Sequence, residues 1–356
     1  MTDPLKLKFD EIIYLNEEKL DKKYIQSLTK QQRLDLVEPV FNILRASGWV
    51  YPDDLNKVKK SWNALLAYQP DLMADDLFNN SSLATDICKY FCNNFFLATE
   101  KGKSTLIDNF NDDKILKRII ENRLGLDWLD ADKNGPGVNE AFNLSFKMIA
   151  CQGQRSMRLV NATSMFKPTV SKFMALKYSN ENDTIFDYSC GFGGRLLGTM
   201  AANRKYIGTD PLTTEELENM ATFLQFKKDR YALIKSGSEN YRGDENSVDL
   251  SYSSPPYLAQ EVYSSDITQA YNQGDDYFYN TYWKQTLANV KYMLKPGKIF
   301  GFNILAKYTK MIEMAKEQFG EPIETVKLRT VRSHLSKGPT QTDQKNEPIY
   351  IFKNNK

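Results

Sequence analysis

The chain has 356 residues, of which 41% are hydrophobic and 26% are charged, and its formal net charge is +2. This composition is typical of a folded globular protein long enough for two domains, and it argues against a disordered or fibrous chain. A net charge this close to zero neither requires nor excludes a nucleic-acid partner, so a nucleic-acid surface would have to be local.

The sequence contains neither a signal-peptide pattern nor a long apolar run, so we expect a cytoplasmic protein without membrane association. Metal binding through cysteine and histidine is also not expected, because a structural zinc site needs about four clustered ligands. The chain has four cysteines and one histidine: Cys88, Cys92, Cys151, Cys190 and His334. We expect the cysteines to be buried, reduced thiols.

Residues 1–150 show apolar positions at helical spacing, which predicts a helical accessory domain. A capping box from Thr29 to Gln32 predicts the start of a helix that Gly48 ends and Pro39 kinks. Nothing in this half points to chemistry, and a target-recognition or partner-binding role is the alternative to plain packing.

A cluster of turn-forming residues at 130–139 predicts a connector to a second domain, which we place at 151–356. The same stretch matches the first half of a calcium-binding loop. That loop requires a glutamate at its twelfth position, where this chain has Ala141, so calcium is not expected.

From about residue 184, short apolar runs alternate with helical patterns. This alternation predicts an α/β fold, with a seven-stranded, mainly parallel Rossmann-like sheet covered by helices on both faces. The last two strands have no helix between them and are expected to form a hairpin. The strands are expected at 184–188, 205–209, 231–236, 247–253, 298–304, 323–330 and 347–353.

The first of these strands ends at Asp187 and runs into a turn that contains Gly191, Gly193 and Gly194. Glycines in such a turn allow the backbone to approach a ligand closely. The spacing does not match a dinucleotide fingerprint, which requires a glycine where this chain has Leu196. A phosphate loop would require lysine after the last glycine, where this chain has Arg195.

A second acid, Asp210, ends the next strand, 17 residues after Gly193. An acid at about this distance from a glycine turn is expected to bind a ribose diol. Further along, Ser254-Pro255-Pro256-Tyr257 follows another apolar strand. Two consecutive prolines remove two backbone donors and fix a rigid corner.

This combination resembles the class I S-adenosylmethionine-dependent methyltransferases. More narrowly, it resembles the DNA amino-methyltransferases, which carry an (Asp/Asn/Ser)-Pro-Pro-(Tyr/Phe) signature. The resemblance covers roughly residues 160–356 and implies S-adenosylmethionine as the cofactor.

The resemblance implies a role for each motif on the cofactor side. Asp187 would receive the cofactor's ammonium, the backbone of Gly191 and Gly193 would approach the cofactor closely, and Asp210 would bind the ribose hydroxyls. A turn-capping aspartate is the alternative for Asp187.

Two further pairs complete the implied cofactor site. Phe166 and Pro168 match the Phe-x-Pro element that packs over the methionine end in this family, although they could simply begin a helix. Ser238 or Glu239 would contact the adenine ring, with a solvated turn as the alternative.

The Ser-Pro-Pro-Tyr motif would hold the acceptor. The Ser254 hydroxyl and the Pro255 carbonyl would accept the hydrogens of an exocyclic amine, Pro256 would keep the corner rigid, and a flipped base would stack on Tyr257. Serine in the first place favours N4 of cytosine over N6 of adenine, whereas the order of the motifs is that of many adenine enzymes. Methylation at C5 of cytosine is disfavoured because Cys190 lies inside the glycine turn.

The stretch between the last two predicted strands has a local excess of positive charge, which suits contacts to DNA phosphates, although basic loops are often only solvated. The candidate residues for these phosphate contacts are Lys327, Arg329, Arg332 and Lys337. We therefore expect a DNA amino-methyltransferase. The alternatives are an RNA base or protein amide methyltransferase, or an inactive nucleic-acid-binding scaffold.

Overall fold

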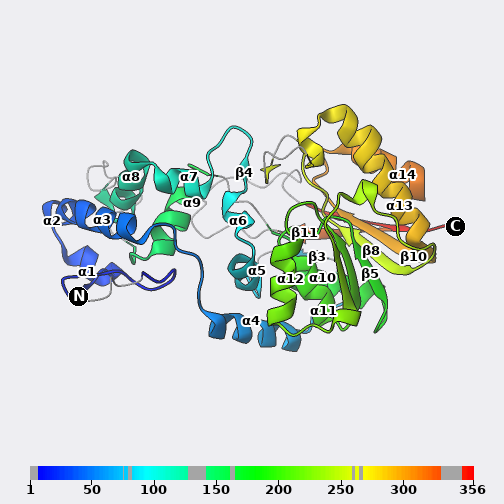
Figure 1. Cartoon of the computed structure of the whole chain (residues 1–356), viewed down its shortest axis with the longest axis horizontal. Helices are drawn as coiled ribbons and strands as arrows, with labels where there is room; N and C mark the ends of the chain where they lie inside the picture. The colour runs from blue at the N-terminus through cyan, green and yellow to red at the C-terminus, as the bar shows by residue number, and fades with distance from the viewer. Residues whose placement is uncertain are drawn as a thin grey trace. The chain divides into compact units, whose positions relative to one another are not determined.

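The computed structural model describes residues 7–74, 76–78, 82–126, 142–160, 165–258, 261–263, 268–329 and 347–356 (Figure 1). The chain divides into two compact units. Unit 1 takes its residues from 1–54, 93–163 and 260–263, and unit 2 takes its residues from 55–92, 164–259 and 264–356. The connector expected at 130–139 and the calcium-like loop lie outside the described residues.

Unit 1 is mainly helical, as predicted. Its helices are α1 (Lys22–Ser27), α2 (Lys30–Asp35), α3 (Val37–Ser47), α6 (Asn94–Leu97), α7 (Leu106–Asn111), α8 (Asp113–Arg123), the π-helix η2 (Lys147–Gly153) and α9 (Gln154–Ser156). Two short strand pairs join them: β1 (Tyr14–Leu15) with β2 (Glu18–Lys19), and β4 (Thr99–Glu100) with β9 (Glu261–Val262). An aromatic cluster forms part of the core, in which the Trp49 ring meets Phe110 and Phe146 edge-on at centroid distances of 5.4 and 5.3 Å.

The capping box of Thr29 and Gln32 is present, but the helix it starts is shorter than expected. Helix α2 ends at Asp35, and α3 begins at Val37. Pro39 therefore lies in the first turn of α3, where the backbone N–H groups have no partner within the helix, so proline loses no hydrogen bond there. The predicted kink at Pro39 is wrong, because the helix is interrupted at Leu36 instead.

Unit 2 is built on an eight-stranded sheet with the order β3-β11-β12-β10-β8-β5-β6-β7. Its strands are β3 (Asp76–Phe78), β5 (Thr184–Asp187), β6 (Lys205–Thr209), β7 (Tyr231–Ile234), β8 (Val248–Ser253), β10 (Leu294–Asn303), β11 (Glu324–Arg329) and β12 (Ile349–Lys353). Strand β12 runs antiparallel to both β10 and β11, and the other pairs are parallel. The seven predicted strands and the Rossmann-like fold are confirmed, and β3 adds an eighth strand that was not predicted.

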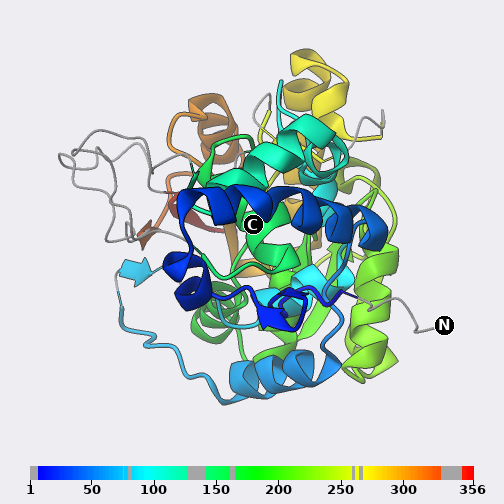
Figure 2. The same ribbon diagram turned by 90° about the vertical axis from the view of Figure 1, so that its left-hand side faces the viewer.

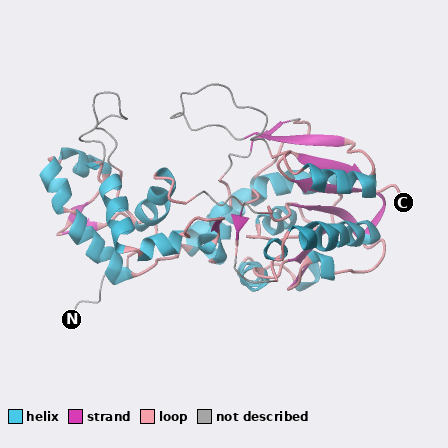
Figure 3. Ribbon diagram, turned by 90° about the horizontal axis from the view of Figure 1, so that it is seen from above, coloured by secondary structure: helices cyan, strands magenta, loops and turns pink. Residues whose placement is uncertain are grey.

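Helices pack against both faces of this sheet (Figure 3). They are α10 (Pro168–Tyr178), α11 (Gly194–Ala201), α12 (Thr214–Phe223), the π-helix η6 (Tyr277–Trp283), α13 (Lys284–Met293) and α14 (Thr309–Phe319). Neighbouring residues of a strand point to opposite faces, so Ile185 packs with Phe173 of α10 while Phe186 packs in the layer that contains Trp283.

The boundary expected at residue 150 differs from the compact units, because residues 55–92 belong to unit 2. Three contacts hold this segment. Strand β3 pairs with β11, the Trp62 ring of α4 (Leu55–Ala67) packs on Phe226 at 5.2 Å, and Phe91 of α5 (Thr85–Phe91) packs on Phe223 at 5.5 Å.

A buried lysine also joins α4 to α10. Figures 1 and 2 show α4 as the blue helix along the lower edge of each view. The ammonium of Lys172, which is 2% exposed, donates to the carbonyls of Leu65, Leu66 and Tyr68 at 2.7–3.0 Å. These carbonyls lie at the C-terminus of α4, where a helix has unpaired acceptors and a partial negative charge. Burial lowers the pKa of Lys172.

Replacing this lysine should destabilise unit 2. Lys172→Met keeps the apolar stem but leaves three carbonyls without their charged donor, so we expect the free energy of unfolding to fall by about 2–3 kcal/mol. The matched control is Lys177→Met on the same helix, which removes a half-exposed ion pair with Glu324 and should cost about 1 kcal/mol or less. Chemical denaturation measures both, and equal losses would contradict the capping role.

Candidate functional site

The candidate site lies where the order of the strands in the sheet reverses. From β5 the chain proceeds outward to β6 and β7, and it then crosses back to β8 on the other side of β5. Ligands of open α/β sheets bind at such a switch point, outside the carboxyl ends of the strands. Here β5 ends at Asp187, and β8 ends at Ser253, directly before the Pro-Pro corner.

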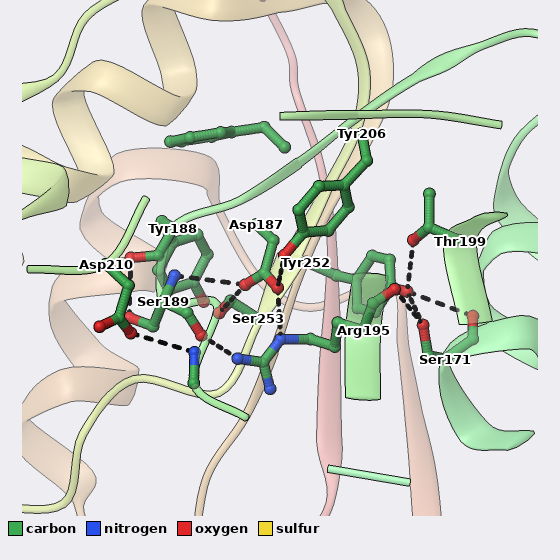
Figure 4. Close-up of polar contacts among 12 residues, drawn as sticks. Ser171, Asp187, Tyr188, Ser189, Arg195, Thr199, Tyr206, Asp210, Tyr252 and Ser253 are labelled. Atoms are coloured by element: carbon green, nitrogen blue, oxygen red, sulfur yellow. Dashed lines mark hydrogen bonds and ion pairs between the residues drawn. The ribbon is translucent and has the colours of Figure 1, made fainter. Parts of the chain in front are cut away.

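These two strand ends are joined by a hydrogen bond. The Ser253 hydroxyl donates to Oδ1 of Asp187 at 2.6 Å, and both side chains are buried (Figure 4). The glycine turn and the Ser-Pro-Pro-Tyr motif are 60 or more residues apart in sequence, yet they begin from adjacent, bonded positions. The structure therefore brings the two predicted motifs together at one edge of the sheet.

Asp187 is the centre of a buried network and has no exposed surface. Its Oδ2 accepts from Nε of Arg195 at 2.9 Å and from the Tyr206 hydroxyl at 2.7 Å. Its Oδ1 accepts from Ser253 and from the Ser189 amide at 3.2 Å. A carboxylate offers about four acceptor positions, so these four donors use its whole capacity (Figure 4).

Arg195 lies in the first turn of α11 and is 4% exposed. Burial is the largest single effect and lowers the pKa of Arg195, but Asp187, Tyr206 and Cys190 together raise it above the ordinary value. The same guanidinium donates to the Ser189 carbonyl and lies over the Phe166 ring, 5.1 Å from its centroid. The pair is thus a buried, hydrogen-bonded ion pair held between the glycine turn and Phe166.

The glycine turn has the backbone conformation that its sequence predicts. Gly191 and Gly193 have φ of +55° and +81°, in the region that favours glycine. At Gly194 a β-carbon would lie 1.9 Å from the carbonyl oxygen of Phe166. The Phe-x-Pro segment, with Pro168 in the first turn of α10, therefore packs directly against the turn.

Asp210 follows β6 and is tied to the same turn. Its carboxylate accepts from the amides of Gly191, Leu212 and Thr213 at 2.9–3.0 Å. Burial raises the pKa of Asp210, and the three amide donors oppose that rise. The acid predicted to bind a ribose diol is therefore positioned beside the first glycine.

Ser238 and Glu239 have different surroundings. The Ser238 hydroxyl is buried and bonded to Thr286 at 2.7 Å. Glu239 is 8% exposed; its Oε1 accepts from the Tyr277 hydroxyl at 3.1 Å, whereas no hydrogen bond to Oε2 is found within the described part of the chain. Of the two candidates for the adenine contact, Glu239 is the one that carries a buried acceptor still available for a donor.

The Pro-Pro corner is followed directly by Tyr257, a buried residue that packs on a second aromatic ring. Tyr257 is 5% exposed, and its ring lies 5.5 Å from that of Tyr308, whose hydroxyl donates to the Leu258 carbonyl at 3.3 Å. The carboxyl of Glu347 lies beside the Tyr257 phenol; burial raises the pKa of Glu347, and the phenol opposes the rise. Asn303, at the end of β10, donates to the Glu347 carbonyl at 2.7 Å and holds this residue in place.

Several residues of the site were not predicted from the sequence. Ser253 could have been found, because it ends a strand directly before the corner. No local sequence pattern points to the other three, which are Arg195, Tyr206 and Glu347. Their roles arise from contacts with residues that are distant in the sequence.

The predicted DNA contacts are only partly described. Lys327 lies exposed on β11, and Arg329 ends that strand. Arg332 and Lys337 lie outside the described residues.

The cysteines are free and buried, as predicted. Among the described residues, no group of three metal-ligating side chains is found. In that same part of the chain, no helix has both the length and the apolar character needed to cross a bilayer.

Comparison with known proteins gives no family. No family model matches the chain, and no curated protein sequence matches it. Among solved structures, the chain is similar to an S-adenosylmethionine-dependent O-methyltransferase from Thermotoga maritima, with 13% identity, a TM-score of 0.36, and coverage of 60% of this chain and 72% of the other. It is also similar to the tRNA (m1A58) methyltransferase TrmI from Aquifex aeolicus, with 13% identity, a TM-score of 0.38, and coverage of 63% and 87%.

A third similar structure is an N-methyltransferase from Bradyrhizobium japonicum, with 14% identity, a TM-score of 0.36, and coverage of 53% and 94%. The assignment of the fold depends on the strand order and on the switch point described above.

The Asp187 network should make a large contribution to stability. Asp187→Asn leaves the buried Arg195 charge without its partner, so we expect a loss of about 3 kcal/mol in the free energy of unfolding. Ser253→Ala removes one of four donors to the same carboxylate and should cost about 1.5 kcal/mol, the low end for a hydrogen bond to a charged group. Urea denaturation measures both variants, and a loss for Asp187→Asn no greater than that for Ser253→Ala would contradict a central role for the ion pair.

Proposed function

We propose that unit 2 binds S-adenosylmethionine and transfers its methyl group to the exocyclic amine of a base in DNA, N4 of cytosine being favoured over N6 of adenine. The observation that carries the proposal is the Ser253–Asp187 hydrogen bond. It brings the start of the Pro-Pro corner to the start of the glycine turn, at the switch point where α/β sheets bind ligands.

The residues at the strand ends fit the cofactor. The positive-φ glycines leave the turn without side chains, Asp210 is a fixed acid suited to the ribose hydroxyls, and the free Oε2 of Glu239 suits an adenine amine. Phe166 and Pro168 pack against the same turn at Gly194. When bound, the cofactor supplies an electrophilic methyl group on a sulfonium.

The corner fits an amine acceptor. The lone pair of an exocyclic amine is delocalised into the base, so the amine is a poor nucleophile until its hydrogens are held. The Ser254 hydroxyl and the Pro255 carbonyl lie on a rigid corner and can accept hydrogen bonds from the amine hydrogens. These hydrogen bonds can direct the nitrogen lone pair toward the methyl group. Tyr257 would stack on a base flipped out of the duplex, since the amine of a paired base is not accessible.

The chemistry of Cys190 supports an amine rather than a ring carbon as the acceptor. Methylation at C5 of cytosine requires a thiolate nucleophile. The Cys190 thiol is buried, and burial raises its pKa well above the ordinary value, which keeps it protonated. Contacts to DNA phosphates are proposed for Lys327, Arg329, Arg332 and Lys337.

A labelled-methyl transfer assay with DNA, RNA and protein as acceptors tests this function. We expect label in DNA, and we expect nucleoside mass spectrometry to find N4-methylcytosine. Label only in RNA would support an RNA base methyltransferase and overturn the DNA assignment. No transfer to any acceptor, together with no binding of S-adenosylhomocysteine, would support an inactive scaffold.

Changes at the Pro-Pro corner should separate catalysis from cofactor binding. For Ser254→Ala and Tyr257→Ala we expect kcat to fall about 10-fold or more, because each removes a group that holds the acceptor in the transition state. The dissociation constant of S-adenosylhomocysteine should stay within about twofold of the wild-type value. Glu317→Gln, an exposed change on α14, is the control, and a parallel loss of cofactor affinity in the corner variants would argue against this division.

Asp210 should control both the affinity for the cofactor and its pH dependence. Removing a charged acceptor costs about 1.5–3 kcal/mol, so Asp210→Asn should weaken binding of S-adenosylhomocysteine by about 10–100-fold. The pKa of Asp210 is raised, so wild-type affinity should fall with decreasing pH at a higher pH than for an ordinary aspartate. Isothermal titration calorimetry across pH measures this, and a pH dependence unchanged in Asp210→Asn would assign it to another group.

A further inference from the structure

A buried cation, Arg195, is paired with Asp187, the acid that the sequence predicts for the cofactor's ammonium. Arg195 lies at the glycine turn, and two of its three guanidinium nitrogens are engaged by protein groups. Nε donates to Asp187 at 2.9 Å, and Nη2 donates to the Ser189 carbonyl. The acid itself is enclosed, because Asp187 has no exposed surface and receives four donors.

The third nitrogen of Arg195 is available. For Nη1, neither a hydrogen bond nor an ion pair is found among the residues that the structure describes. In Figure 4 one terminal nitrogen of Arg195 points away from Asp187 and carries no dashed line.

The guanidinium has surroundings that suit a ligand site. The Phe166 ring lies over it, and the backbone of Gly191 lies beside it, where an added β-carbon would be in ordinary contact with Nη2 at 3.8 Å. A planar guanidinium fixed on two sides presents its remaining donors in a set direction, which suits recognition of a carboxylate.

We propose that Arg195 binds the carboxylate of the amino-acid end of S-adenosylmethionine, and that Asp187 is a positioning residue that orients Arg195 instead of receiving the ammonium. This inference rests on the proposed function and names the residue that recognises one end of the cofactor. Three observations support it: the enclosed acid, the charged guanidinium with an unused nitrogen, and the packing of Phe166 and Gly191 around it. Arg195 keeps its charge in a buried site because its ion pair with Asp187, with smaller contributions from Tyr206 and Cys190, offsets burial.

The test compares two ligands that differ by one group. Decarboxylated S-adenosylmethionine keeps the sulfonium, the ammonium and the nucleoside, and it lacks only the carboxylate. We expect the wild-type protein to bind S-adenosylmethionine about tenfold or more tightly than the decarboxylated ligand, measured by calorimetry. In Arg195→Gln this preference should fall to about twofold or less, through weaker binding of S-adenosylmethionine alone.

Arg195→Gln leaves the Asp187 charge unpaired, so a second variant guards against unfolding. The double variant Asp187→Asn/Arg195→Gln has no unpaired charge at this position and should show the same loss of preference. Arg195→Lys keeps the charge and should retain part of the preference, because a lysine cannot form the planar contact.

The outcomes separate the inference from the function on which it rests. If both variants lose affinity for the two ligands equally, Arg195 has only a structural role and the inference is overturned. If the variants keep the wild-type preference, the carboxylate is bound elsewhere, and the inference fails while the proposed function stands. If the wild-type protein binds neither ligand, the proposed function itself fails.

Discussion

The hydrogen bonds to the Asp187 carboxylate are the constraint on which the rest of unit 2 depends. This side chain ends the central strand β5, and its donors come from β6, from β8 and from the first turn of α11. A buried carboxylate is costly unless its charge is paired and its acceptors are filled. Here both conditions are met, and in meeting them the chain fixes three neighbouring segments relative to one another.

That arrangement explains why two distant motifs can act as one site. Ser253 is both a donor to Asp187 and the residue before the Pro-Pro corner, so the corner cannot move without disturbing the network. Arg195 is both the counter-ion of Asp187 and part of the glycine turn. Asp210, bonded to the amide of Gly191, joins the end of β6 to the same turn. Rigid elements thus hold the donor side and the acceptor side of the proposed reaction, as precise positioning requires.

Much of the fold followed from local patterns in the sequence. Alternating apolar runs predicted the strands, and the positive φ of Gly191 and Gly193 agrees with the turn that their spacing indicated. The domain boundary did not follow from such patterns. Residues 55–92 join unit 2 through the pairing of β3 and through the three carbonyls bound by Lys172. The spacing of apolar residues on a helix predicts which face is buried, but not which element packs against that face.

The site was predictable in outline but not in its electrostatics. The acids and glycines were found because strand ends and turns have recognisable sequences. The partners of Asp187 were not, because Tyr206 and Arg195 reach it through the pairing of strands and the docking of a helix. The sequence therefore indicated which residues gather at the carboxyl edge of the sheet, whereas the structure shows that the first acid is already neutralised.

A crystal structure of the protein with S-adenosylhomocysteine tests the central claim most directly. We expect the ligand at the turn of Gly191 and Gly193, with its ribose hydroxyls on Asp210 and its sulfur facing the corner at Ser254. A ligand bound away from this edge of the sheet, or one whose sulfur faces away from the corner, would contradict it.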